Sequence, residues 1–297
     1  MSSPASRNIR LRLAYEGTRY AGWQIQPNRP TIQGELEAAI LKLTGEETRV
    51  LSAGRTDAGV HALGQVANFQ TTFPIPPHKW RPALQSALPE DIVILESDEV
   101  PPAFHATFSA VSKRYRYVIY NNLVDDPFLR RYSWRITQPL DHVAMHEAAQ
   151  SLVGKFDFRS FESDWPNKAT SVRTVSEISI SRAARWDILT PVSLRVAQEE
   201  LALKDESQRR QLDSLSPFIC LEIEADGFLY NMVRAITGTL VNVGRGTWTA
   251  EDIVRVRDAM DRSQAGGTAP AEGLFMVTVN YPEDLSIRTS RKDELPE

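Results

Sequence analysis

The chain has 297 residues, of which 42% are hydrophobic and 24% charged, a composition that excludes intrinsic disorder and long membrane-spanning segments. Its 34 Lys and Arg residues against 38 Asp and Glu residues give a net charge of −4, which excludes a general affinity of the whole chain for polyanions. A single cysteine, Cys220, excludes an internal disulfide and a Cys-Cys zinc cluster. Because Cys220 lies in an apolar run, we expect it to be a small core residue.

The first part of the chain alternates predicted strands and helices. Residues 9–15 alternate apolar and polar side chains, which predicts a strand with one buried face. Apolar residues at helical spacing predict a helix over 32–43, with Thr31 as its N-cap and Gly45 at its end. Further predicted elements are strands at 50–53, 65–69 and 92–95 and a helix at 80–88.

The rest of the chain also alternates predicted strands and helices, with one interruption. The predicted elements are strands at 114–120, 172–180, 218–225 and 274–279 and helices at 141–153, 228–243 and 250–260. The last of these helices follows a capping box that runs from Thr249 to Asp252. Residues 185–216 are rich in Gln, Glu, Arg and Ser, so they predict a surface insertion.

The order of these elements predicts an α+β fold of two related halves. Pro101 and Pro102 mark the break, which gives an N-terminal half over residues 1–104 and a C-terminal half over residues 105–297. We expect each half to pack its helices on one face of a mainly antiparallel sheet.

Positive charge gathers in residues 105–140, which hold six basic residues against two acidic ones, interleaved with aromatic residues. Guanidinium groups for phosphates beside rings for unpaired bases are typical of an RNA-binding face. We therefore expect Lys113, Arg114 and Arg116 to bind substrate. The alternative is an aromatic core on one face of a strand with solvated arginines on the other.

The strongest local motif is Gly-Arg-Thr-Asp-Ala-Gly-Val-His at residues 54–61. It places Asp57 in a tight loop between two apolar strands, with glycines on both sides that let a ligand approach the backbone. An aspartate held in this way is a candidate nucleophile or base. The alternative is a turn aspartate that bonds its own backbone.

This motif and its continuation, GRTDAGVHALGQVANF, resemble the catalytic loop of the TruA family of tRNA pseudouridine synthases. Other strings agree in the same order: YEGTRYAGWQIQPNRPTIQGELE, FHATFSAVSKRYRYVIYN, GFLYNMVRAITGTLVNVGRG and AEGLFMVTVNYP. The resemblance runs from about Ile9 to Pro282 and so covers nearly the whole chain.

The resemblance implies roles for five residues. Asp57 corresponds to the catalytic aspartate, and Arg234 to the basic residue that pairs with it. Tyr115 corresponds to the tyrosine that stacks on the target base and is a candidate to move its proton. Arg55 corresponds to the arginine associated with nucleotide flipping, and Leu274 to the aliphatic residue that packs against uracil.

The resemblance also implies the architecture and the partners. The two halves are expected to join their sheets into one central mixed sheet flanked by helices, the pseudouridine synthase fold. The implied function is an isomerase that converts uridine to pseudouridine at positions 38, 39 and 40 of the tRNA anticodon stem-loop. We expect a cytoplasmic homodimer that needs no cofactor and no metal, since the reaction only rearranges its substrate.

Two other functions remain open at this point. The same scaffold suits a noncatalytic RNA-binding or tRNA-folding protein, or a pseudouridine synthase that acts on another RNA site. A zinc site at His142 and His146 is disfavoured, because Val143 stands where a His-Glu-x-x-His motif has glutamate and no third ligand is evident.

Overall fold

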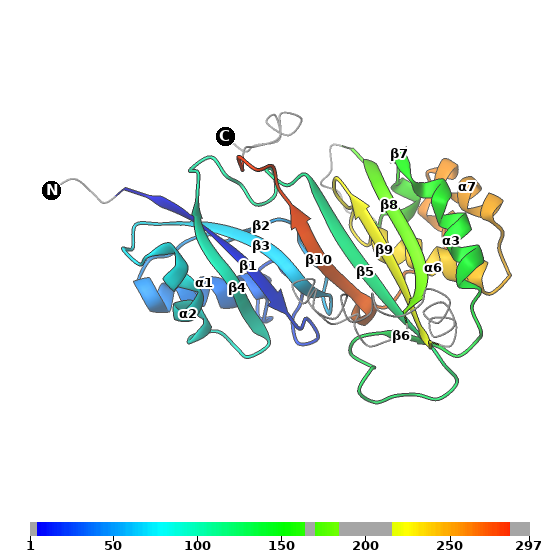
Figure 1. The fold of residues 1–297 in the computed structure, drawn as a ribbon, viewed down its shortest axis with the longest axis horizontal. Helices are drawn as coiled ribbons and strands as arrows, with labels where there is room; N and C mark the ends of the chain where they lie inside the picture. The colour runs from blue at the N-terminus through cyan, green and yellow to red at the C-terminus, as the bar shows by residue number, and fades with distance from the viewer. Residues whose placement is uncertain (1–4, 164–169, 184–215, 286–297) are drawn as a thin grey trace, which may run out of the picture. The chain divides into compact units, whose positions relative to one another are not determined.

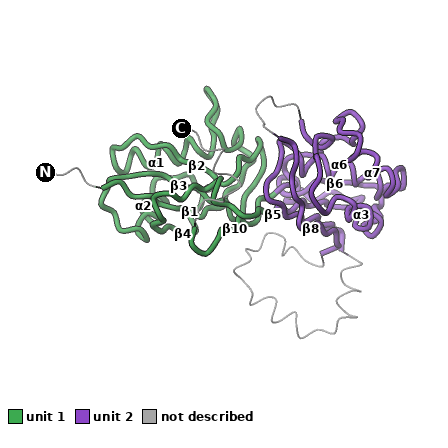
Figure 2. The backbone as a smooth tube through the Cα atoms, turned by 90° about the horizontal axis from the view of Figure 1, so that it is seen from above, with its two compact units in different colours: residues 1–114, 275–297 green, residues 115–274 purple. Residues whose placement is uncertain are grey.

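The structure is a computed structural model that describes residues 5–163, 170–183 and 216–285 (Figure 1). The insertion predicted at 185–216 lies outside these residues, except for Ser216. The chain divides into two units, one of residues 1–114 and 275–297 and the other of residues 115–274 (Figure 2). The last strand of the chain therefore belongs, from Phe275 onward, to the first unit.

The first unit is built on four strands in the order β4-β1-β3-β10. Strands β1 and β4 are antiparallel, as are β1 and β3, while β10 runs parallel to β3 and the short β2 pairs with β3. Its strands and helices are β1 (Arg7–Tyr15), α1 (Ile32–Thr44), β2 (Leu51–Ser52), β3 (His61–Thr71), α2 (Trp80–Gln85), β4 (Ile92–Val100) and β10 (Leu274–Asn280).

Helix α1 begins and ends at the residues that the sequence predicts. The Thr31 hydroxyl accepts a hydrogen bond from the Gly34 N–H at 3.2 Å, and Gly45 ends the helix with a φ of 74°. The helix buries Ile32 and Leu36 completely. In Figure 1, α1 and α2 lie behind the strands of this unit, so the apolar face of the sheet is covered on that side.

Arginines of β1 form a ladder of ion pairs with the acidic residues of β4, with Arg10 and Arg12 on the opposite side of the strand and Arg7 at its start. Arg10 donates to Asp98 at 2.6 and 3.0 Å, and Arg7 donates to Glu99 at 2.7 Å. Arg12 pairs with Glu96 in the same way and lowers the pKa of that carboxyl. Each exposed pair stabilises the fold by about 1 kcal/mol or less. The ladder also neutralises three of the basic residues near the start of the chain.

The second unit is built on strands in the order β5-β9-β8-β7, with β6 parallel to β5. The β7–β8 and β8–β9 pairs are antiparallel. Its strands and helices are β5 (Ser112–Asn121), β6 (Trp134–Ile136), α3 (His142–Ala149), β7 (Gly154–Asp157), β8 (Val172–Ala183), β9 (Phe218–Ala225), α6 (Met232–Gly244) and α7 (Ala250–Ala259).

Helix α6 is the central helix of this unit, and nearly all of its residues are buried. It packs so closely on the chain that follows α7 that a Cβ at Gly238 would lie 1.8 Å from the Gly267 carbonyl oxygen. Helix α7 begins with the predicted capping box, in which the Thr249 N–H donates to the Asp252 carboxylate at 2.8 Å. Within the described residues each unit contains a mixed sheet flanked by helices, which confirms the predicted α+β fold class.

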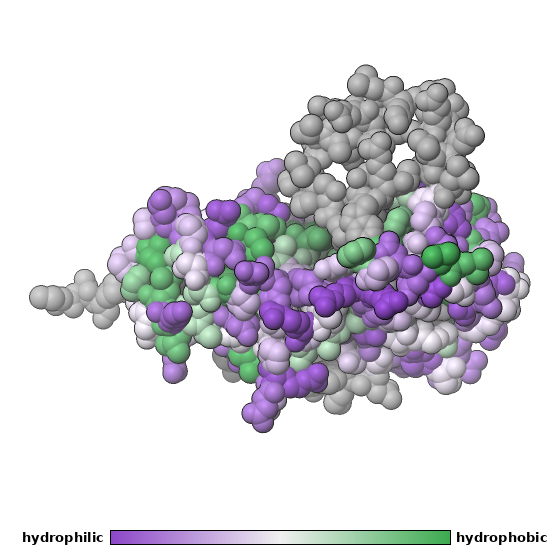
Figure 3. Space-filling model, turned by 90° about the horizontal axis from the view of Figure 1, so that it is seen from below, coloured by the Kyte–Doolittle hydropathy of each residue, from purple (hydrophilic) through white to green (hydrophobic). Residues whose placement is uncertain are grey.

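No described helix is long and apolar enough to cross a lipid bilayer. On the face drawn in Figure 3, hydrophilic side chains predominate and hydrophobic ones gather in small separate groups.

The chemistry of Cys220 provides a test of the packing around β9. Its side chain is buried, and desolvation raises the pKa of the thiol to about 12. Since only the thiolate reacts, we expect the native protein at pH 8 to react with a thiol reagent roughly a thousandfold more slowly than the unfolded chain. The measurement is the labelling rate with and without denaturant, and rapid labelling of native protein would show that β9 opens.

Candidate functional site

The loop that carries Asp57 lies between β2 and β3 in the first unit. Asp57 is half-buried and Arg55 is exposed. The Trp23 N–H donates to the Thr56 carbonyl at 3.0 Å, and the Val60 N–H donates to the Asp57 carbonyl at 3.1 Å. The Asp57 backbone is thus fixed between a neighbouring segment and its own turn. A side chain that contacts a ligand in one defined position needs a backbone fixed in this way.

A glycine brings the segment before α1 against this loop. Gly22 has a φ of +98°, a backbone conformation that L side chains rarely adopt. A Cβ at this position would lie 2.6 Å from the Thr56 carbonyl oxygen and 3.0 Å from the carbonyl carbon of Asp57. The close approach therefore requires glycine.

His61 ends the motif and anchors it. Its Nδ1 accepts the Gly17 N–H at 3.0 Å, and its ring stacks on Phe275 with the centroids 4.8 Å apart. A Cβ at Gly17 would lie 2.0 Å from the Val60 carbonyl oxygen, so this end of the loop is as closely packed as the middle. The histidine of the motif thus has a structural role.

A buried polar network lies beneath the loop. The Tyr15 hydroxyl is 2.8 Å from the Thr56 hydroxyl, and the Gln65 amide donates to the Gly54 carbonyl at 2.7 Å and to the Tyr15 hydroxyl at 3.4 Å. Tyr15, Thr56 and Gln65 are 4%, 5% and 0% exposed. Three side chains from two strands and the loop itself thus hold the residues on either side of Arg55.

Lys113 also lies beside the loop. It is only 7% exposed, although it stands at the start of β5. Its amino group lies 3.5 Å from the position that a Cβ would take at Gly54. The first unit thus holds three of the predicted site residues, Arg55, Asp57 and Lys113, with Lys113 beside the glycine that precedes Arg55.

The second unit holds Tyr115 and Arg234. Tyr115 is 7% exposed and meets Phe228 edge to face, with the ring centroids 4.9 Å apart. Arg234, in the first turn of α6, donates from Nε to the Ala269 carbonyl at 2.7 Å and from Nη1 to the Asn231 side chain at 2.8 Å. These bonds fix the direction of the guanidinium group.

The segment before Leu274 is bound by Tyr117 of β5. The Tyr117 hydroxyl donates to the Pro270 carbonyl at 2.7 Å, and its ring packs so tightly on Gly273 that a Cβ there would lie 2.6 Å from it. Burial and the Glu272 carboxylate raise the pKa of Tyr117, so the phenol stays a donor. Leu274 is 5% exposed at the start of β10.

The other predicted basic residues differ in their surroundings. Arg116 pairs with Glu222, with Nε 2.7 Å from the carboxylate, whereas Arg114 is half-buried. Farther along, Arg130 pairs with Asp125 at 2.7 Å, and Phe128 is 81% exposed. The region predicted as an RNA-binding face thus combines buried rings, paired arginines and an exposed aromatic side chain.

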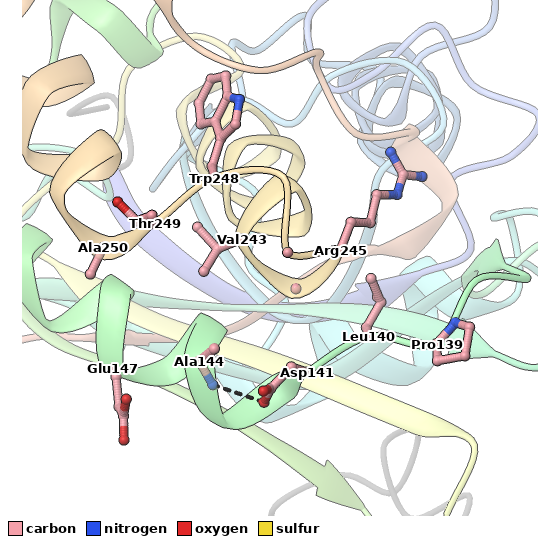
Figure 4. Close-up of a pocket in the computed structure, with 12 residues that line it drawn as sticks. Pro139, Leu140, Asp141, Ala144, Glu147, Val243, Arg245, Trp248, Thr249 and Ala250 are labelled. Atoms are coloured by element: carbon pink, nitrogen blue, oxygen red, sulfur yellow. Dashed lines mark hydrogen bonds between the residues drawn. The ribbon is translucent and has the colours of Figure 1, made fainter.

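A cavity of about 680 Å³ lies elsewhere in the second unit, between α3 and the loop that joins α6 to α7 (Figure 4). None of the predicted site residues lines it. The Asp141 carboxylate at its wall accepts the Val143 and Ala144 N–H groups at 3.0 Å, and the Asp141 N–H donates to the Gly244 carbonyl at 2.9 Å. The Asp141 groups at this wall thus serve to cap helix ends.

Of the two histidines on α3, His146 has a structural role. The His146 Nδ1 accepts the Ile180 N–H at 3.2 Å, which ties α3 to β8. Burial lowers the pKa of His142. Within residues 5–163, 170–183 and 216–285, no three His, Cys, Asp or Glu side chains gather as metal ligands would.

Comparison with known proteins adds to this geometry. The family model described as tRNA pseudouridine synthase matches residues 13–109 and 148–282. The chain is 45% identical to tRNA pseudouridine synthase A of Moorella thermoacetica over 275 residues, which cover 92% of this chain and 99% of the relative. The proteins of the same name from Thermoanaerobacter sp. and Acetivibrio thermocellus are 41% and 42% identical, over 93% of this chain and 100% of each relative.

The chain belongs to the tRNA pseudouridine synthase family. The parts that match the family model include the loop with Asp57, the first turn of α6 with Arg234, and Leu274. Tyr115 lies in the stretch between the two matched ranges.

Three residues around the motif of this pseudouridine synthase family member were not among the predicted site residues. Tyr15, Gln65 and Gly22 support the Asp57 loop through contacts with residues distant in sequence. One signal was present for Gln65, which, like Asn68, is a polar residue within a mostly apolar run of β3. For Tyr15 and Gly22 the sequence carries no such signal, because their roles depend on tertiary packing.

Proposed function

We propose that this protein converts uridine to pseudouridine at positions 38, 39 and 40 of the tRNA anticodon stem-loop, with Asp57 as its catalytic residue. The observation that carries the proposal is the Asp57 loop, which is held on both sides and beneath in a chain 45% identical to a tRNA pseudouridine synthase A. Binding a polyanion gives no reason for a half-buried carboxylate, whereas such a carboxylate can open a glycosidic bond as a nucleophile or base.

The reaction rearranges one nucleoside. The bond from N1 of uracil to the sugar breaks, a bond from C5 to the same sugar carbon forms, C5 loses a proton and N1 gains one. We propose that the ionised Asp57 carboxylate opens this sequence and that Tyr115 stacks on the base and accepts the C5 proton, directly or through water. No electrons are gained or lost, so the chemistry requires no redox cofactor.

The remaining residues bind and orient the substrate in this proposal. Arg234 keeps the Asp57 carboxylate charged, since a cation opposes the rise in pKa that burial causes. Arg55 grips the flipped nucleotide, whose extrusion costs roughly a few kcal/mol. Leu274 packs on uracil, and Lys113 and Arg114 neutralise phosphates.

The direct test uses purified protein and tRNA transcripts made without modifications. We expect pseudouridine at positions 38, 39 and 40 where the transcript has uridine, and none when cytidine replaces those uridines. Modification elsewhere in the tRNA would favour the alternative of a different RNA site. Binding without any product would favour the noncatalytic RNA-binding protein. Mapping pseudouridine in cells that lack and then regain the protein extends the test to natural tRNA.

The affinity for tRNA should depend steeply on salt. Cationic side chains displace counterions from phosphates, so neutralising about four phosphates predicts a roughly 100-fold loss of affinity between 50 and 200 mM salt. The slope of the logarithm of affinity against the logarithm of salt concentration reports how many phosphates are neutralised. Exposed Arg55 is expected to neutralise about one of them, so Arg55→Ala should make this slope shallower by about one. The matched control is Arg12→Ala, which removes the same charge from a side chain paired with Glu96. An affinity indifferent to salt would contradict phosphate binding.

We propose further that the protein is a cytoplasmic homodimer. A dimer lets two modest basic surfaces share one tRNA, which compensates for the net charge of −4. Sedimentation at micromolar concentration, with and without tRNA, measures the state directly. A single monomeric species under both conditions would contradict the dimer.

A further inference from the structure

The buried polar network under the motif loop connects β1, the loop and β3 through side chains. Its members are Tyr15 at the end of β1, Thr56 in the loop, and Gln65 in β3. Thr56 directly precedes Asp57, so contacts that hold Thr56 in place also restrict the backbone that carries the Asp57 side chain. The network thus reaches the proposed catalytic residue through one peptide bond.

The direction of the hydrogen bonds follows from the donors available. An amide N–H of Gln65 can only donate, so the Tyr15 oxygen accepts from it at 3.4 Å. The Tyr15 and Thr56 hydroxyls lie 2.8 Å apart, and either of them can donate to the other. The same Gln65 amide holds the Gly54 carbonyl at 2.7 Å, so both ends of the segment 54–56 are fixed from beneath.

Burial makes this arrangement stable against ionisation. Desolvation raises the pKa of Tyr15 to about 12, so the phenol keeps its hydrogen throughout the range in which the enzyme can be assayed. A buried hydroxyl left without a partner loses roughly 1–3 kcal/mol. Each member of the network therefore restricts the others to one rotamer.

The backbone around the network leaves the loop little other freedom. The Trp23 N–H holds the Thr56 carbonyl at 3.0 Å, and Gly22 lies against the same carbonyl. The carbonyl side of Thr56 is therefore fixed by the segment before α1 and its side chain by Tyr15. Removal of one hydroxyl would free the side chain while the backbone contact remains, so the loop would loosen without unfolding.

We propose that Tyr15, Thr56 and Gln65 are positioning residues that set the orientation of the Asp57 carboxylate for the isomerisation. This inference rests on the proposed function of Asp57 and adds a dependence of the chemical step on a hydrogen bond that never touches the substrate. A carboxylate displaced by about 1 Å can lose roughly 100-fold in rate.

The test compares single-turnover rates of pseudouridine formation with tRNA affinity. Tyr15→Phe and Thr56→Val each delete one hydroxyl of the pair, and we expect the rate constant to fall roughly 10- to 100-fold while the Kd for tRNA changes little. Thr56→Ser keeps the hydroxyl and should restore most of the rate. The double variant should be no slower than the slower single variant, because both changes break the same bond.

Tyr281→Phe is the matched control for loss of a hydrogen-bonded phenol, and Tyr281 is partly buried. Tyr281 lies in the same unit and its hydroxyl donates to the Ala106 carbonyl at 2.8 Å, outside the motif loop. We expect a similar loss of thermal stability with an unchanged rate. All variants are assayed at a temperature at which circular dichroism shows them folded.

The outcomes separate the inference from the proposed function. Rates of Tyr15→Phe and Thr56→Val equal to that of the native protein would overturn the positioning role and leave the function of Asp57 intact. Equal slowing by Tyr281→Phe, or rate losses that simply add in the double variant, would overturn it as well. A native protein that forms no pseudouridine would overturn the proposed function and the inference with it.

Discussion

Asp57→Asn is expected to lower the rate of pseudouridine formation by at least roughly 1000-fold while tRNA binding is retained. The substitution preserves size and removes the charge and the basicity of the carboxylate. Because the lost charge repels phosphate, the affinity for tRNA should stay equal or rise slightly. The measurements are single-turnover product formation and a filter-binding Kd on the same protein preparation.

Two further variants sharpen this result. Asp57→Glu keeps the charge but moves the carboxylate by about one methylene, so we expect an intermediate rate. Asp98→Asn removes a carboxylate from the ladder with Arg10, far along β4 from the motif, and should leave the rate unchanged. Full activity of Asp57→Asn would exclude the proposed role, and the protein would then be one that acts on tRNA by another residue or only binds it.

Gly22→Ala is expected to destabilise the first unit and to inactivate the protein. A positive φ costs a side chain roughly 1–2 kcal/mol, and overpacking against the Thr56 carbonyl adds roughly 1–3 kcal/mol. The clash is with backbone, which cannot rotate away as a side chain could. We therefore expect a lower midpoint of thermal unfolding and, in the protein that remains folded, a displaced Asp57 loop with a rate reduced roughly 100-fold.

Gly45→Ala is the matched control for the cost of placing a side chain at a positive φ. Gly45 also has a positive φ, of +74°, but a Cβ there meets nothing within 4 Å. The control should lose only about 1 kcal/mol of stability and none of the rate. If both variants behaved alike, the close approach of Gly22 to the loop would not matter for activity.

The sequence predicts those elements whose ends carry local signals. The N-cap at Thr31, the glycine at the end of α1 and the capping box of α7 are confirmed, because each depends on residues within one turn. The alternation of β1 is confirmed as well, with Ile9, Leu11 and Leu13 fully buried. Local rules suffice where the interaction is local.

Predictions of element length were less accurate where tertiary contacts decide. Strand β3 begins at His61 and not at residue 65, because its first residues pair with Phe275 and Met276 of β10. Helix α6 begins at Met232 and not at residue 228, since Asn231 takes a φ of 61° before it. Strands β6 and β7 were not predicted, because three or four residues are too few to give a periodic signal.

In the candidate site, too, the features carried by a local motif were predicted and those that depend on long-range contacts were not. Asp57 and Arg55 were predicted from a motif of eight residues, and both lie on one loop whose backbone is held by hydrogen bonds. Sequence gives no indication that Lys113 becomes buried beside Gly54, or that Arg116 pairs with a glutamate about a hundred residues away. Long-range ion pairs and burial depend on the register of strands that are far apart in the chain.

The ion pairs between β1 and β4 also affect whether another strand can pair with β4, the edge strand of the first unit. Strand β4 ends the order of strands in the first unit, and the edge strand of a sheet can pair with another polypeptide. Glu96, Asp98 and Glu99 belong to this edge strand, and their side chains are 66%, 48% and 43% exposed. An incoming strand would have to break their pairing or bury their charge, so the ladder that stabilises the fold only modestly also protects concentrated solutions from fibrous self-association.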